Sequence, residues 1–296
     1  LVRSRGLGDV YKRQLQDFWF GGASMIERRS PTRFLRRIGN VAHHIFSWVT
    51  FLFLLTPLLI VIPISFSGGS YLSFPPESYS TRWYETYFAQ DSWIDATILS
   101  LQVGVVATVI SVAVGFLFAL GITRGLRKWG PALEKVALAP MIVPSIVYSV
   151  SMYSLFSRLG LVGNWFGIAL AHAILCLPFV VIVLTASLRE YDIDQETAAM
   201  GLGASRLTAI RRITIPQIRP SLLSAAFLAF ITSFDELVVA MFLSGTFGTL
   251  PKKMFDNIRL QIDPTIAAVS VMEILMVILV LIVLMRLNRA NVGRLS

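Results

Sequence analysis

Long apolar runs separated by short polar segments form the main pattern of this chain. Six runs are long enough to cross a bilayer, because a transmembrane helix needs about 20 apolar residues rising about 1.5 Å each. The six runs are Ile45–Phe66, Thr97–Ile122, Val136–Phe156, Trp165–Leu188, Ser221–Ser244 and Thr265–Met285. The pattern predicts an all-α integral membrane protein with six transmembrane helices.

Prolines lie inside two of these runs. Pro140 and Pro144 are in the third run and Pro178 is in the fourth. Proline has no backbone N–H and its ring clashes with the preceding helical turn, so we expect both helices to be interrupted. Interrupted helices at membrane depth line a cavity or pack against protein, since lipid cannot satisfy the freed backbone groups.

Small residues recur along the second run and allow neighbouring helices to approach closely. They are Gly104, Thr108, Ser111 and Gly115. We therefore expect the second helix to pack tightly inside a bundle.

The composition agrees with a membrane protein. Hydrophobic residues make up 55% of the chain and charged residues only 15%, against about a quarter in soluble domains. The net charge of +9 does not indicate a nucleic-acid partner, because the chain has no groove-reading motif. The lone cysteine, Cys176, excludes an intrachain disulfide framework and is expected to pack within its apolar run.

The distribution of basic residues predicts the orientation. With the N-terminus inside, 21 of the 26 lysines and arginines lie on the inner side and five on the outer side. Basic residues accumulate on the cytoplasmic side of bacterial membrane proteins. We therefore expect a protein of the bacterial inner membrane with both termini in the cytoplasm. The polar loop 190–220 is expected on the same side.

The ends of the chain are expected to lie outside the spanning domain. Residues 1–24 show no periodicity that would bury a face, and we interpret them as a non-native or artefactual leader that precedes Met25. Residues 25–44 form a basic cytoplasmic N-terminus. Residues 45–286 form the six-span domain, and residues 287–296 form a cytoplasmic tail.

The polar loop 190–220 contains signals for two short helices and a turn. Asp194 is a candidate N-cap, and Gly203 is suited to the left-handed conformation that ends a helix. Ser205 is positioned to cap a second helix that runs through Arg211 and Arg212. Proline then ends this helix, at Pro216 and Pro220.

The spacing of residues in this loop resembles a known motif. Ala198-Ala199, then Gly203, then Ile213 and Ile215-Pro216 follow the pattern A-A-x-x-x-G and I-x-[L/I]-P. This is similar to the "EAA" loop of binding-protein-dependent ABC importer permeases, in which the loop forms the coupling helix that docks on the ATPase subunit. The resemblance implies that the docking residues are Asp194, Glu196, Thr197, Ala198, Ala199, Gly203, Ala204, Ser205, Ile213 and Pro216.

The chain departs from that motif at one position. Where the family usually has glutamate this chain has Thr197, and a carboxylate stands one residue earlier at Glu196. The docking shape is compatible with this change, but a salt bridge from the usual glutamate is not expected.

Three carboxylates lie within the last two runs: Asp235, Glu236 and Glu273. Burying each in a membrane costs about 2.5–3.5 kcal/mol on insertion scales, so such groups face a bundle interior or water. Two interpretations remain open. Either these carboxyls are protonated or hydrogen-bonded to hydroxyls such as that of Ser233, or they form an acidic cluster that attracts a cation.

The sequence around the carboxylates sharpens the family resemblance. AFITSFDELVVAMFLSG, LPKKMFDNIR and DPTIAAVSVMEIL resemble the C-terminal half of the PotC-type permeases of spermidine/putrescine importers. The resemblance implies a MetI-like ABC type I importer permease without a cofactor of its own. Its expected partners are a second homologous permease, a cytoplasmic ATPase dimer that binds ATP and Mg²⁺, a periplasmic substrate-binding protein and the lipid bilayer. Related permeases for ferric iron, sulfate or opines share the loop motif, so another substrate is the alternative.

Two other classes of function fit the sequence poorly. One is an intramembrane acid–base enzyme that uses Asp235, Glu236 and Glu273. The neighbours Asp235 and Glu236 would point about 100° apart on a helix, so they would not face one reacting group together. The lone His172 in the fourth run is expected to pack or hydrogen-bond rather than bind a metal. A passive channel would leave the loop motif unexplained. The chain has no G-x-x-x-x-G-K-[ST] motif, so ATP must bind another chain.

Overall fold

The structure, a computed structural model, describes residues 31–125, 128–246, 248–260 and 264–292. It divides into two units, residues 1–58 and 59–296. Within the described ranges the regular structure is helical, with one isolated antiparallel bridge between Ser67 and Tyr79. The expected leader 1–24 and the end of the expected tail, 293–296, lie outside the described residues.

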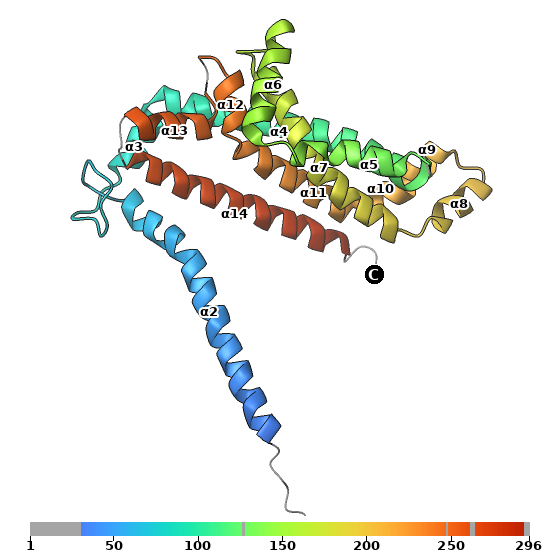
Figure 1. Cartoon of the computed structure of the whole chain (residues 1–296), viewed down its shortest axis with the longest axis horizontal. Helices are drawn as coiled ribbons and strands as arrows, with labels where there is room; N and C mark the ends of the chain where they lie inside the picture. The colour runs from blue at the N-terminus through green and yellow to red at the C-terminus, as the bar shows by residue number, and fades with distance from the viewer. Residues whose placement is uncertain (1–30, 126–127, 247, 261–263, 293–296) are drawn as a thin grey trace, which may run out of the picture. The chain divides into compact units, whose positions relative to one another are not determined.

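The helices follow one another closely along the chain (Figure 1). Their bounds are α2 Pro31–Ser65, α3 Arg82–Ala89, α4 Asp91–Leu120, η1 Gly121–Gly125, α5 Gly130–Leu138, η2 Ala139–Met141, α6 Ser145–Arg158, α7 Trp165–Glu190, α8 Asp194–Gly201, α9 Arg206–Ala209, η3 Ile210–Thr214, α10 Ile215–Gln217, α11 Arg219–Phe234, α12 Val238–Leu243, α13 Leu250–Leu260 and α14 Thr265–Val292. Of these, η1 and η3 are π-helical and η2 is a 3-10 helix.

The first unit holds most of α2. Its apolar side chains, among them Phe46, Trp48 and Phe53, are exposed around the helix. A helix that is apolar on all sides is stable only in a nonpolar environment such as lipid. This is what the sequence predicts for a first membrane span.

The described residues contain four helical stretches long and apolar enough to cross a membrane. These are Ala42–Ser65, Asp91–Gly125, Trp165–Glu190 and Thr265–Val283. Two helix pairs meet the same test only together: Gly130–Met141 with Ser145–Arg158, bent by 99°, and Arg206–Gln217 with Arg219–Phe234, bent by 74°. Six spans result when each bent pair counts as one span.

The prolines act differently in the two runs. In the third run the helix does break, since Pro140 lies in η2 and Pro144 is the residue before α6. The expected interruption at Pro178 is wrong, because α7 continues through it and buries it. Here α7 packs along both α4 and α11, and these contacts hold the helix although one backbone donor is missing.

Helices α4, α7 and α11 form the core of the second unit (Figure 1). Close packing depends on small residues, as the sequence predicts. A Cβ at Gly115 would lie 2.6 Å from a methyl group of Val180 on α7, and one at Gly104 would lie 3.1 Å from the ring of Phe230 on α11. No larger side chain fits at Gly115 without moving α7.

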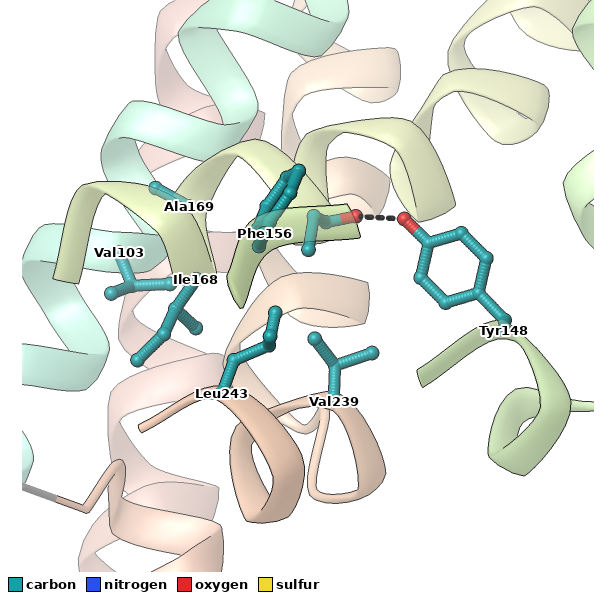
Figure 2. Close-up of a cluster of buried hydrophobic side chains, with 8 residues drawn as sticks. Val103, Tyr148, Phe156, Ile168, Ala169, Val239 and Leu243 are labelled. Carbon is teal, nitrogen blue, oxygen red and sulfur yellow. Dashed lines mark hydrogen bonds between the residues drawn. The ribbon is translucent and has the colours of Figure 1, made fainter. Parts of the chain in front are cut away.

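A second cluster of buried side chains joins α4, α6, α7 and α12 (Figure 2). Val239 and Leu243 of α12 are fully buried against Ile168 of α7. The Tyr148 hydroxyl on α6 donates a hydrogen bond of 2.8 Å to the Ala171 carbonyl on α7. The short helix α12 is therefore anchored firmly to the rest of the bundle.

The fifth apolar run is not a single helix, contrary to the sequence-based expectation. Helix α11 ends at Phe234 and α12 begins at Val238. Phe234 and Val239 are both buried, in separate apolar clusters, so the break between them is held from both sides. At one end of the bundle lie α8 and α9, and at the opposite end lie α3 and α13 (Figure 1).

Candidate functional site

The loop 190–220 forms two short helical stretches separated by a turn, as predicted. Gly203 has φ +94°, in the left-handed region that favours glycine. The Ser205 hydroxyl accepts a 3.2 Å hydrogen bond from the Thr208 N–H and so caps α9. The predictions for Gly203 and Ser205 are confirmed.

Two details of the predicted loop are wrong. The N-cap of α8 is Ile193, and Asp194 is the first helical residue. The reason is that the Asp192 carboxylate accepts a 3.0 Å hydrogen bond from the Asp194 N–H and sets the turn one residue earlier. Pro216 does not end the second stretch, which continues to Gln217, because a proline in the first turn of a helix costs no hydrogen bond.

Pro220 likewise lies in the first turn of α11 rather than at the end of a helix. It begins the next helix after Ile218. Pro216 and Pro220 therefore lie in the first turns of α10 and α11, and neither ends a helix as the sequence predicted.

The outer face of the loop is apolar and basic. Leu202 is 91% exposed and Leu207 is 75% exposed. A hollow of about 390 Å³ is lined by Leu207, Thr208, Arg211 and Arg212. The other motif residues range from exposed to half-buried: Asp194, Thr197, Ala198, Gly203, Ser205 and Pro216 are exposed, and Ala199, Ala204 and Ile213 are half-buried. Exposed leucines beside arginines are typical of a surface that binds a partner protein.

Glu196 points away from this outer face. It is only 3% exposed, and its carboxylate forms an ion pair with Arg124 of η1 and accepts a hydrogen bond from the Thr214 hydroxyl of η3. The Arg124 guanidinium also lies 5.2 Å from the centre of the Tyr191 ring. We name Glu196, Arg124, Thr214 and Tyr191 the buried cluster. Sequence reasoning missed it, because Arg124 is 72 residues away and entered only as a charge in the topology.

Thr197, at the usual glutamate position, forms no ion pair. Its hydroxyl donates a 3.3 Å hydrogen bond to the Ile193 carbonyl, within its own helix. The carboxylate of this motif is therefore that of Glu196, which is buried and binds Arg124 and Thr214.

Two of the three carboxylates of the last two runs, Asp235 and Glu236, lie at the break between α11 and α12. Asp235 follows the last residue of α11 and is exposed. Glu236 accepts a 3.0 Å hydrogen bond from the Val239 N–H in the first turn of α12, whose N-cap residue is Leu237. Glu273 is half-buried on α14 and lies within electrostatic range of Asp235. The structure thus leaves Asp235 exposed, gives Glu236 a backbone partner and half-buries Glu273 within electrostatic range of Asp235.

One of the hydroxyls expected to bind the carboxylates, that of Ser233 rather than those of Thr232 or Ser270, has a different partner in the structure. Ser233 lies 2.9 Å from Nδ1 of His172, and both side chains are buried. His172 thus connects α7 and α11 as a hydrogen-bonding group, as the sequence predicts. Cys176 is buried and its thiol donates to the Ala229 carbonyl at 3.2 Å.

A cavity of about 700 Å³ lies at the end of the bundle that carries α13. Its charged lining residues are Asp95, Lys252, Lys253 and Asp256. Lys252 pairs with Asp256 at 3.7 Å, and Lys253 lies 5.5 Å from the centre of the Trp93 ring. Opposite charges are balanced here, in contrast to the acidic group at the helix break.

Within the part of the chain that the structure describes, no three His, Cys, Asp or Glu side chains are grouped to hold a metal ion. The same residues contain no lysine or arginine paired with Asp235, Glu236 or Glu273. The candidate site therefore consists of an exposed apolar and basic surface at one end and of carboxylates without an ion-pair partner at a helix break.

Comparison with known proteins gives a consistent result. Residues 111–296 match the family described as binding-protein-dependent transport system inner membrane component. The chain is 31% identical over 229 residues to the spermidine/putrescine transport system permease protein PotC of Haemophilus influenzae, covering 77% of this chain and 88% of that protein. It is 32% identical over 230 residues to the putrescine transport system permease protein PotI of Escherichia coli, covering 75% and 82%.

Solved structures show the same fold. A bacterial ABC transporter involved in the import of the acidic polysaccharide alginate aligns with TM-score 0.67 at 20% identity, over 84% of this chain and 96% of that chain. The MetNI methionine ABC transporter aligns with TM-score 0.57 at 19% identity, over 70% and 97%. The relatives are permease subunits and not enzymes, which removes the intramembrane-enzyme alternative. The chain therefore belongs to the family of binding-protein-dependent transport system inner membrane components, the MetI-like permease subunits of ABC importers.

Proposed function

We propose that this chain is the permease subunit of an ABC importer that takes up polyamines such as spermidine and putrescine. The observation that carries the proposal is the 31–32% identity to PotC and PotI over three quarters of the chain. A second permease, an ATPase dimer that binds ATP and Mg²⁺, and a substrate-binding protein complete the transporter.

The proposed orientation places the α8 end in the cytoplasm. The basic residues of the loop 190–220 and of the segment after α4 favour this side by the positive-inside rule. Both termini are then cytoplasmic, and the cavity beside α13 faces the periplasm, where a binding protein delivers substrate.

The proposed ATPase contact is the outer face of the loop 190–220. Leu202 and Leu207 would insert into an apolar cleft of the ATPase, while Arg211 and Arg212 would face carboxylates on its surface. This assignment leaves Glu196 out of the contact, because Glu196 is buried.

The proposed substrate contact is the acidic pair Asp235 and Glu273. A polyamine is a chain of ammonium groups, and two carboxylates without a basic partner provide the opposite charge. Glu236 is the weaker candidate, because its carboxylate already accepts a backbone hydrogen bond.

The test is ATPase activity and uptake by the complex reconstituted with its co-encoded subunits and loaded binding protein. The ligands are spermidine, putrescine and a ferric chelate. We expect stimulation by a polyamine, and a loss of about tenfold or more in Asp235→Asn, which removes one charge from the acidic pair. Glu134→Gln is the control, because it removes a carboxylate charge from the exposed ion pair with Arg189 at the opposite end of the bundle, and it should retain uptake.

A different substrate is the second candidate. The trehalose transport system permease protein SugB of Mycobacterium tuberculosis is 30% identical over 65% of this chain, so the family includes a sugar permease. Stimulation only by a neutral sugar, or only by the ferric chelate, would retain the permease and reject the polyamine.

A further inference from the structure

The buried cluster connects four parts of the chain around one carboxylate. Glu196 is in α8, Arg124 in η1 at the end of α4, Thr214 in η3, and Tyr191 between α7 and α8. Arg124 and Thr214 both donate to the same Glu196 oxygen, Oε1. The side chains of the ion pair are 3% and 4% exposed.

A fully buried ion pair has a specific mechanical consequence. Removing two charges from water is costly, and the pair is stable only while both partners stay in contact. Separation of α8 from α4 would leave one buried charge without its partner. The two helices are therefore expected to move together.

Helix α4 continues from this cluster to the opposite end of the bundle. It packs along α7 and α11, and its Gly104 lies against Phe230, five residues before Asp235. Near its other end the Ser100 hydroxyl accepts a 2.7 Å hydrogen bond from the Leu250 N–H of α13. Helix α4 with its continuation η1 thus contacts the loop 190–220 through Arg124, the helix α11 that precedes Asp235 through Gly104, and α13 through Ser100.

We propose that the Glu196–Arg124 ion pair is the joint through which displacement of the coupling helix α8 moves α4. Glu196 and Arg124 are positioning residues: they touch neither ATP nor substrate. The inference rests on the proposed docking of α8 on an ATPase. It gives the carboxylate at position 196 a role that Thr197 does not take, since Glu196 reaches Arg124 whereas Thr197 hydrogen-bonds within its own helix.

The chain offers a matched control for this pair. Arg189 of α7 and Glu134 of α5 form an ion pair of 3.2 Å at the same end of the bundle, but their side chains are 58% and 38% exposed. Exposed pairs contribute little to stability or rigidity. Glu134→Gln removes the same charge as Glu196→Gln without opening a buried contact.

The first experiment measures substrate molecules imported per ATP hydrolysed by the reconstituted complex. We expect Glu196→Gln and Arg124→Gln each to lower this ratio at least fivefold while ATP hydrolysis continues. The double variant should be no worse than either single variant, because both remove one joint. Glu134→Gln should match the wild type. A wild-type ratio in Glu196→Gln, or additive losses in the double variant, would overturn the inference.

Thr214→Val serves if the charge variants do not assemble. It removes the hydroxyl that donates to Glu196 and retains the ion pair, and a smaller loss of the import ratio is expected. A loss as large as the fivefold loss expected of the charge variants would contradict the inference, because the ion pair remains in Thr214→Val.

The second experiment needs neither substrate nor partners. Amide hydrogen exchange of the full chain in detergent should accelerate in both α8 and η1 in Glu196→Gln, and in neither in Glu134→Gln. Acceleration confined to α8 would mean that the pair does not link the two elements. Failure of wild-type import with every ligand would reject the proposed function and leave this exchange result to decide the inference about the joint.

Discussion

At the scale of single residues, Gly203 shows how backbone conformation rather than crowding selects an amino acid. Its φ is +94°, yet no heavy atom lies within 4 Å of the place a Cβ would occupy. Gly201, two residues earlier, has equally open surroundings without a positive φ. The two glycines form a matched pair for substitution.

We expect Gly203→Ala to destabilise the turn of the coupling loop by about 1–2 kcal/mol, because an L side chain in the left-handed region clashes with its own backbone. That corresponds to about tenfold faster amide exchange in the loop. Gly201→Ala should have no such effect, since alanine is the better helix former. Equal exchange in the two variants would show that the turn does not depend on the left-handed glycine.

At the scale of elements, the segment from the end of α8 through α9 presents leucines that are largely exposed within the described chain. Leu202 is the most exposed of them, at 91%. Leu260 on α13 is exposed to a similar degree, 82%, but lies at the opposite end of the bundle. Comparing substitutions at Leu202 and Leu260 distinguishes loss of ATPase docking from the general effect of changing an exposed leucine.

Leu202→Asp is expected to abolish co-purification of the ATPase subunit without lowering the amount of folded permease, because a charge cannot enter an apolar cleft. Leu260→Asp should leave the complex intact. Co-purification of the ATPase with Leu202→Asp would show that the contact lies elsewhere.

The contact between α4 and α7 depends on the absence of a side chain at Gly115. We expect Gly115→Ala to destabilise the bundle by about 1–3 kcal/mol, since the added methyl would overlap Val180 on α7. The thermal unfolding midpoint in detergent measures the effect. Gly201→Ala adds the same methyl in open space and should leave the midpoint unchanged; a similar midpoint in both variants would contradict the close contact.

At the scale of the whole molecule, the proposed orientation can be measured directly. Cys176 is the single cysteine and is fully buried, so the wild-type chain provides a low background for thiol labelling. An impermeant maleimide added to intact spheroplasts should label Tyr71→Cys and label Leu202→Cys only after permeabilisation. The reverse result would invert the proposed topology.

Much of this architecture is predictable from the sequence because it depends on local properties. The length of each apolar run can be read directly from the sequence. Gly203 followed by Ser205 predicts a turn and then the N-cap of the next helix. The same local reasoning fails at Pro178, where neighbouring helices maintain a helix that an isolated segment would break. It also misplaces the end of the fifth helix, which depends on α12 being buried against α6 and α7.

The sequence by itself determined the membrane class, the six apolar runs, the charge asymmetry and the spacing motif of the loop 190–220, because hydropathy, charge and short spacings are properties of contiguous residues. Only the tertiary structure decided that Glu196 faces Arg124 and Thr214, which are 72 and 18 residues away. It also decided that Glu236 accepts a backbone hydrogen bond in the first turn of α12 while Asp235 remains exposed. A buried charged side chain points toward the partner that neutralises it. Which distant residue becomes that partner depends on how the whole bundle packs.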